Sequence, residues 1–288
     1  MLTLQQLIAS IIIGLVQGIS EWLPISSKTQ VLVTSTYLLK LTFQQAYTFG
    51  LFMEIGTIIA AAIYFRKDLW SLIQVLLGSK DQHSTRLLVY IVVTIIMTGL
   101  IGAPIYHYVD SLQGVALGIP LLILGVILII DALLIRHSRI KSAHGSNTRK
   151  LQNLGIKDYV LVGIAQGIAA LPGVSRSGIT TSTLLLLKVE ADEAFRLSFI
   201  TGIFAAIAAF GLTIVTSSSN VSASVSSIGI SGLVIAIAVA TITSLFLIDF
   251  LIKIAGKSSI VYLTAALGVI AIASGLLYTA LPVAGLGG

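Results

Sequence analysis

The chain has 288 residues, of which 56% are hydrophobic and only 10% are charged, and its mean hydropathy is +1.04. This composition is typical of an integral membrane protein and argues against a soluble globular domain. The chain contains no cysteine, which excludes disulfides, thiolate zinc sites and a cysteine nucleophile.

The first predicted element, residues 7–39, is an apolar region that Glu21 and Pro24 interrupt near its middle. Each of its arms is shorter than the ~20 residues that a spanning helix needs. A break of this kind predicts a re-entrant helix-loop-helix, whose backbone must be covered by protein or face a water-filled cavity. Three apolar stretches that are long enough to span the membrane follow, at 46–65, 87–106 and 115–135.

The second half of the chain repeats this order. Residues 158–188 are apolar and broken at 171–173, and three spanning stretches follow at 195–215, 229–252 and 259–281. The two broken regions also match in sequence, because Gly14–Ile19 parallels Gly163–Ile168 and Leu23-Pro24 parallels Leu171-Pro172. This internal match indicates a duplicated unit.

An odd number of crossings in each half requires the second copy to enter the membrane upside down. The predicted fold class is therefore an all-α polytopic membrane protein. It forms a single membrane domain, 1–288, made of two inverted repeats, 1–150 and 151–288. Each repeat contains one re-entrant helix-loop-helix and three transmembrane helices.

The 17 Lys and Arg residues separate by membrane side under this topology. Nearly all lie on the side of the 136–157 loop, whereas the opposite side has only Lys40, and Lys28 and Arg176 lie in the two breaks. The positive-inside rule then places the 136–157 loop in the cytoplasm and both termini outside a plasma membrane. The net charge of +6 thus reflects topology, and no nucleic-acid partner is expected.

The outer 216–227 loop contains Asn220-Val221-Ser222. This triplet is either a glycosylation sequon or a chance occurrence in a serine-rich loop, and both interpretations stay open.

Charged residues inside apolar regions are informative because each costs roughly 2.5–3.5 kcal/mol at the centre of a membrane helix. Four stand out: Glu21, Lys28, Glu54 and Arg176. Asp131 and Asp249 lie close to Arg136 and Lys253 near predicted inner helix ends, so we expect them to be structural. The four histidines include no pair at a metal-ligand spacing.

Polar side chains gather at both breaks. Gln17 and Glu21 are four residues apart and therefore share one helix face. Each break precedes a helix whose free N–H groups and positive dipole end favour an anion, beside Lys28, Arg176 and several serines. A carboxylate at such a place suits a general base or a ligand of a divalent cation. This pattern favours phosphate chemistry, while the alternative is that these side chains only satisfy the backbone of two broken helices.

The two breaks resemble the motifs of the undecaprenyl pyrophosphate phosphatases, also called bacitracin-resistance phosphatases. Gln17 and Glu21 match E/Q-x-x-x-E, Pro24–Ser27 match P-x-S-S, and Pro172–Thr180 match PGxSRSxxT without a gap. The resemblance covers essentially the whole chain. It implies an outward-facing site that hydrolyses a C55 polyprenyl diphosphate, recycles the glycan carrier lipid and uses a divalent cation, Mg or Ca.

Two departures from the family pattern occur, at Gln17, where the family often has Glu, and at Gln30, where it usually has His. They leave a dolichol-type substrate open, and the sequence leaves a homodimer open. Glu54 is interpreted either as a substitute acid or base for the missing histidine or as a buried partner of Lys28.

The resemblance also implies residue roles. Ser27 would attack the terminal phosphorus, with Glu21 as base or metal ligand and Gln17 orienting it, while Arg176 clamps the diphosphate. Direct attack by a water that Glu21 activates stays open. Further residues expected to contact the substrate are Ser26, Lys28, Gln30, Ser175, Ser177 and Thr180.

A transporter or flippase of a phosphorylated polyprenyl lipid is the alternative function, because inverted repeats with broken helices are also transporter architecture. Glu21 beside Ser26 and Ser27 favours hydrolysis, since a transporter needs no base.

Overall fold

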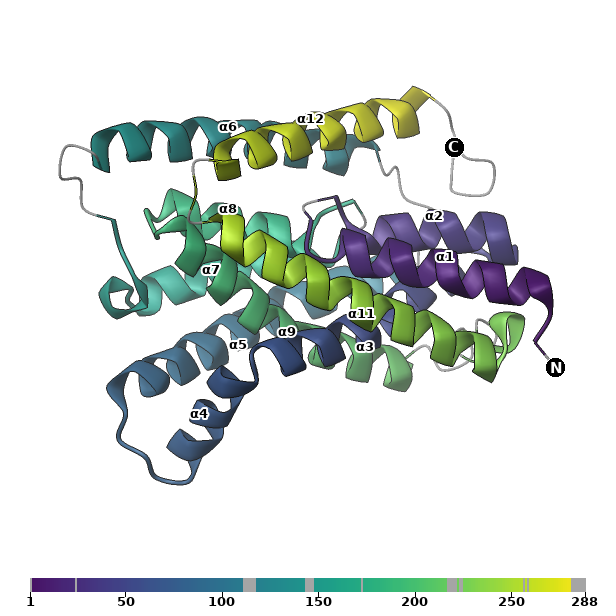
Figure 1. Cartoon of the computed structure of the whole chain (residues 1–288), viewed down its shortest axis with the longest axis horizontal. Helices are drawn as coiled ribbons and strands as arrows, with labels where there is room; N and C mark the ends of the chain where they lie inside the picture. Colours follow the sequence, from purple (N-terminus) through teal and green to yellow (C-terminus); the bar gives the residue numbers. More distant parts are fainter. Residues whose placement is uncertain are drawn as a thin grey trace.

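The computed structural model of the chain describes residues 2–23, 25–110, 118–142, 148–171, 173–216, 222, 225–255, 257 and 259–280. Every named element in these ranges is a helix (Figure 1). The first half contains α1 (Leu4–Ser20), α2 (Ser27–Leu39), α3 (Phe43–Tyr64), α4 (Arg66–Leu76), α5 (Gln82–Asp110) and α6 (Gly118–Ser142). The second half contains the short 3-10 helix η1 (Leu151–Asn153), α7 (Ile156–Ile168), α8 (Arg176–Leu186), α9 (Ala191–Thr216), α11 (Ile230–Ala255) and α12 (Ser259–Ala280). The prediction of an all-α fold is confirmed.

Helix–loop–helix units form at both predicted breaks, α1 with α2 and α7 with α8. The last turn of α1 closes with a hydrogen bond from the Glu21 N–H to the Gln17 carbonyl, and α2 begins after Ser26. In the second unit α7 ends at Ile168, and Ser175 caps the start of α8 by accepting the Gly178 N–H. Pro24 and Pro172, to which the sequence assigns the breaks, lie outside the described residues.

Within the described part of the chain, four helices are long and apolar enough to cross a membrane: α3, α5, α9 and α11. They match the predicted crossings 46–65, 87–106, 195–215 and 229–252. Helices α6 and α12 occupy the places of the other two, but the apolar stretches described within them are shorter. The protein is a multi-pass membrane protein, and the number of six crossings stays a prediction.

Glycines at matching positions of the two halves allow a hairpin helix of each half to pack on a crossing of the other. In α1, Gly14 and Gly18 face α11, and in α7, Gly163 and Gly167 face α5. A Cβ at any of the four would come within 2.8 Å of the facing helix, so only glycine permits this approach. The matched packing supports a repeat, and the inversion of its halves across the membrane stays a prediction.

Helices α6 and α12 lie side by side along one face of the molecule (Figure 1). Gly125 and Gly268 let them approach, because a Cβ at either would lie within 2.9 Å of the other helix's backbone oxygen. The pair reaches the rest of the fold mainly through α8. The side chain of Asp131, which the sequence assigns a structural role, lies outside the described residues, as do Asn220 and Val221 of the sequon.

Helix α4 was not expected from the sequence, which indicates only a connection between two crossings there. It is too short to span, and it exposes Trp70, Ile73 and Leu76 while Leu72 is buried. Asp68 in its first turn pairs with Arg196 of α9 and so fixes its position. Near the C-terminal end of α11, Asp249 pairs with Lys253 at 2.5 Å, as predicted.

Candidate active site

The loops of the two hairpins contact each other directly, as predicted. The Gly173 N–H donates a hydrogen bond to Thr29 Oγ1 at 2.9 Å, and Ser177 Oγ donates to the Glu21 carbonyl at 2.9 Å. Both bonds are buried. Each hairpin thus satisfies buried polar groups of the other, and the two stabilise each other's conformation.

Glu21 is the centre of the contacts between the two loops, and its residue is only 5% exposed. Its Oε2 accepts hydrogen bonds from Ser27 Oγ at 2.6 Å and from Gln17 Nε2 at 2.9 Å. Its Oε1 accepts one from Arg176 Nη2. The Ser27 hydroxyl is thus directed at a carboxylate oxygen, which is the arrangement in which a carboxylate removes a hydroxyl proton.

Arg176, the first residue of α8, connects this carboxylate to a second one. Its Nη1 donates to the Gly202 carbonyl at 2.6 Å and lies 3.6 Å from Glu54 Oε2. A guanidinium has five N–H donors, so these three partners leave donors for a phosphate. Of the two interpretations of Glu54, the structure changes the second. Glu54 forms its ion pair with Arg176 rather than with Lys28.

The backbone at Ser26 has φ 59°, in the left-handed region that non-glycine residues rarely adopt. Its hydroxyl lies 3.0 Å from Thr29 Oγ1. Such strained conformations cluster at functional sites, where surrounding contacts hold them in place. Here the left-handed residue turns the chain so that Ser27 begins α2 with its hydroxyl next to Glu21.

The hydroxyls of the second loop have structural partners. Ser175 Oγ accepts the Gly178 N–H and lies 3.2 Å from Ser177 Oγ. Ser177 in turn donates to the Glu21 carbonyl. The structure therefore places both serines at the site, and their predicted contacts to a diphosphate stay predictions.

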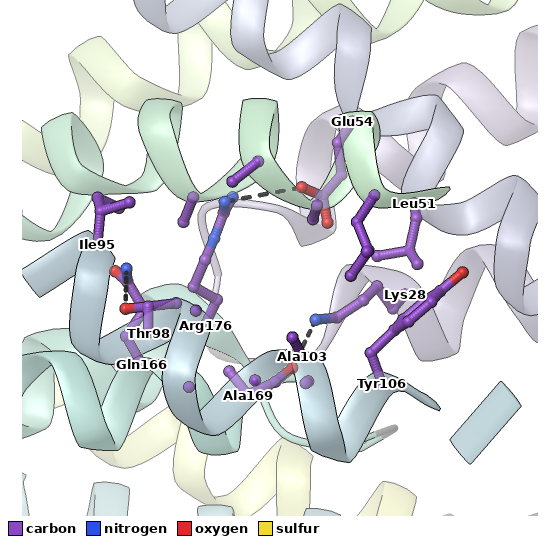
Figure 2. Close-up of a pocket in the computed structure, with 18 of the residues that line it drawn as sticks. Lys28, Leu51, Glu54, Ile95, Thr98, Ala103, Tyr106, Gln166, Ala169 and Arg176 are labelled. Atoms are coloured by element: carbon purple, nitrogen blue, oxygen red, sulfur yellow. Dashed lines mark hydrogen bonds and ion pairs between the residues drawn. The ribbon is translucent and has the colours of Figure 1, made fainter. Parts of the chain in front are cut away.

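Lys28 is buried, with 8% of the residue exposed, and its Nζ donates to the Ala169 carbonyl of the second hairpin at 2.5 Å. A lysine has three N–H donors, so one is used by this bond. Figure 2 shows the ammonium group at the edge of a cavity, on the side opposite Arg176.

Two predicted residues stand apart from the group around Glu21. Gln30 donates to the Ile25 carbonyl at 3.1 Å and so stabilises the first loop. Thr180 donates to Gln166 Oε1 at 3.4 Å. The predicted contacts of both residues to the substrate stay predictions.

Gln166 and Thr98 were missed as residues of this region. Gln166 is buried, donates to Thr98 Oγ1 at 3.0 Å and lines the cavity next to Arg176. The internal repeat could have indicated Gln166, because it occupies in the second hairpin the position that Gln17 has in the first. Thr98 gave no such signal, because only the folded chain brings it beside α7.

A divalent cation was expected at this site. The described residues include no group of three or more His, Cys, Asp or Glu side chains that could hold a metal ion. Mg²⁺, however, is commonly bound by one or two carboxylates together with substrate phosphates. Glu21 offers a carboxylate, and the neighbouring Gln17 Oε1 is buried and has no hydrogen-bond partner among the described residues. These two side chains fit a cation that takes its remaining ligands from phosphate and water.

The fold and the site define a class of protein: a helical membrane protein in which two broken helical hairpins combine a serine–carboxylate pair with a buried arginine. A model of the family described as bacitracin resistance protein BacA matches residues 10–273. The chain belongs to this family.

Similar curated proteins cover nearly the same length. An undecaprenyl-diphosphatase of Saccharolobus solfataricus is 48% identical over 272 residues, which are 94% of this chain and 96% of the relative. One of Sulfurisphaera tokodaii is 49% identical over 264 residues, 91% of this chain and 94% of the relative. One of Pyrobaculum aerophilum is 35% identical over 268 residues, which are 92% of this chain and 96% of the relative.

Proposed function

We propose that the protein hydrolyses a polyprenyl diphosphate to the polyprenyl monophosphate and phosphate. The observation that carries this proposal is the Ser27 hydroxyl 2.6 Å from a Glu21 oxygen while Arg176 contacts the other oxygen of the same carboxylate. The relatives' name, undecaprenyl-diphosphatase, supports the C55 undecaprenyl chain, or a dolichol-type chain of similar chemistry, as the lipid. The product is the carrier lipid in the form that accepts a new glycan.

In the proposed mechanism, Glu21 removes the hydroxyl proton of Ser27 while its Oγ attacks the terminal phosphorus. The bond from this phosphorus to the bridging oxygen breaks, and the polyprenyl phosphate leaves. Arg176 neutralises the charge that develops on the phosphoryl oxygens. Glu21 passes this proton to the departing polyprenyl phosphate. Its carboxylate then takes a proton from a water that attacks the phosphoserine, the bond between Ser27 Oγ and phosphorus breaks, the proton returns to Oγ and phosphate leaves. Direct attack by an activated water gives the same products without that intermediate.

A divalent cation, Mg or Ca, belongs to this proposal. Glu21 and Gln17 Oε1 would hold it, and when bound it would supply positive charge to the phosphate oxygens as a Lewis acid. The two side chains are neighbours, because Gln17 Nε2 donates a hydrogen bond to Glu21 Oε2 at 2.9 Å.

We place the site toward the outer side of a plasma membrane. The distribution of Lys and Arg residues supports a 136–157 loop inside and termini outside. The outward-facing site is what the resemblance to the undecaprenyl pyrophosphate phosphatases implies. The two halves are then related by an inverted repeat.

The test is phosphate release from a polyprenyl diphosphate by the purified protein in detergent, where no second compartment exists. The native chain should release one phosphate per diphosphate, and Ser27→Ala should lose at least about 10²-fold in rate. Ser35→Ala is the matched control, because Ser35 is a buried serine of the same helix whose hydroxyl bonds only to backbone carbonyls of α2.

Radioactive phosphate trapped on Ser27 would support the phosphoserine route. Full turnover in Ser27→Ala would leave only direct attack by water. Tight binding of the lipid by the native chain without any phosphate release would contradict hydrolysis and favour a transporter.

A further inference from the structure

A cavity of about 290 Å³ lies beside Arg176, between α3, α5, α7 and α9 (Figure 2). Its described lining includes Arg176 and Glu54 but neither Ser27 nor Glu21. The Arg176 guanidinium contacts Glu21 with one nitrogen and faces Glu54 with the other. The cavity therefore adjoins the serine–carboxylate pair through the guanidinium and does not coincide with it.

One end of the cavity is charged. Lys28 and Arg176 reach it from opposite sides, and Glu54 lies between them along the rim (Figure 2). Lys28 uses one of its three N–H donors on the Ala169 carbonyl, and Arg176 has donors beyond its three protein partners. Glu21 and Glu54 already pair with Arg176, so what favours an anion between the two cations is the set of N–H donors that Lys28 and Arg176 have left.

The other end is apolar and lined by small residues. Gly99, Gly102 and Ala103 line it from α5, and Ala205, Ala208 and Ala209 line it from α9. These six residues leave space between the two spanning helices, while Ile95, Tyr106 and Leu212 add larger side chains to the lining.

The cavity also opens to the side. Gly99 and Ala208 line it and are at the same time exposed on the surface of the protein. Their neighbours in the chain, Leu100 and Ile207, are 63% and 51% exposed on helices that cross the membrane. The opening between α5 and α9 is thus at the surface that faces lipid.

The size of the cavity limits what it holds. It lies at the lower end of the range of ligand pockets, roughly 300–1,000 Å³, so it admits a phosphate and a short stretch of hydrocarbon but not a long polyprenyl chain. An occupant with a charged head and a long apolar arm must leave through the opening.

We propose that this cavity binds the lipid side of the substrate. The phosphate next to the prenyl chain lies between Lys28 and Arg176, and the first isoprene units pass between Gly99 and Ala208 into the bilayer. This inference rests on the proposed function. It gives Arg176 contact with both phosphates, since the terminal phosphate is attacked on the Ser27 side of the guanidinium and the leaving phosphate lies on the Lys28 side.

Thiol labelling tests the path without relying on activity, because the native chain has no cysteine. Gly99→Cys and Ala208→Cys are compared with Leu100→Cys and Ile207→Cys, which lie at the same depths outside the cavity lining. Polyprenyl monophosphate should slow maleimide labelling of the first pair at least about threefold and leave the second pair unchanged. Inorganic phosphate, which has no hydrocarbon arm, should protect neither pair. Equal effects on both pairs would overturn the proposal.

Filling the opening gives a second readout. Gly99→Leu should raise KM for the polyprenyl diphosphate by roughly tenfold or more with kcat little changed. Leu100→Val is the control, because Leu100 lies on the same helix, is 63% exposed and is outside the cavity lining. An unchanged KM in Gly99→Leu would also overturn the proposal.

The experiments distinguish a failure of the lipid path from a failure of the proposed hydrolysis. Protection at Gly99 and Ala208 without phosphate release by the native chain would retain the lipid path and remove the proposed hydrolysis. Phosphate release without protection at these positions would retain hydrolysis and remove the path.

Discussion

At Glu21, hydrogen bonds from the two halves of the chain meet on one side chain. Ser27 and Gln17 of the first hairpin bind one oxygen, and Arg176 of the second binds the other. The spacing of Gln17 and Glu21 predicted that they share a face, and the motifs predicted Ser27 and Arg176. The pairing of Arg176 with Glu54 was not predictable, because only folding brings α3 and α8 together.

Two buried carboxylates contact the same guanidinium, but only Glu21 contacts the proposed nucleophile. We therefore expect Glu21→Gln to lower kcat at least about 10²-fold through loss of the base. Glu54→Gln, which keeps the size of the side chain while Arg176 retains Glu21 and the Gly202 carbonyl, should lower kcat less than about tenfold. Phosphate release at saturating lipid measures both. Equal losses in the two variants would make Glu54 a second acid or base, the other interpretation that the sequence allowed.

At the scale of elements, the lengths of the apolar stretches and the breaks within two of them predicted the spanning helices and the hairpins. This was possible because membrane thickness fixes how long a crossing must be. Helix α4 did not follow, since its apolar residues are too few for a span and its position depends on the ion pair of Asp68 with Arg196. The sequence also did not predict that α7 contacts α5, although the glycines that permit this contact belong to the repeated segment.

Packing at these glycines can be tested directly. In Gly163→Val, the new Cβ would lie 2.6 Å from the Thr94 carbonyl oxygen and from Met97 Cβ, so α7 must shift away from α5. Overpacking of this kind costs about 1–3 kcal/mol, which should lower the Tm in detergent by several degrees. Gly99→Ala, on α5 in open space, should leave the Tm unchanged. An unaltered Tm in Gly163→Val would mean that the two helices are not closely packed there.

Across the whole molecule, the Lys and Arg residues predicted an orientation, and matched packing of α1 on α11 and of α7 on α5 supports two related halves. Orientation itself is a relation between the protein and the membrane, so no contact inside the chain decides it.

Single cysteines in the otherwise cysteine-free chain decide the orientation. A membrane-impermeant maleimide added to intact cells should label Lys40→Cys, in the predicted outer connection, and leave Lys150→Cys unlabelled until the cells are opened. Both positions are exposed, so accessibility to water does not differ between them. Labelling of Lys150→Cys alone would reverse the proposed topology.

The central claim is that the two hairpins form one hydrolytic unit, in which each half supplies what the other lacks. The most direct measurement is a double-mutant cycle on the rate of phosphate release, with Glu21→Gln from the first hairpin and Arg176→Gln from the second. Groups that act as a unit give strongly non-additive losses, so the double variant should be about as slow as the slower single variant. A double variant slowed by the product of the two single losses would contradict the account.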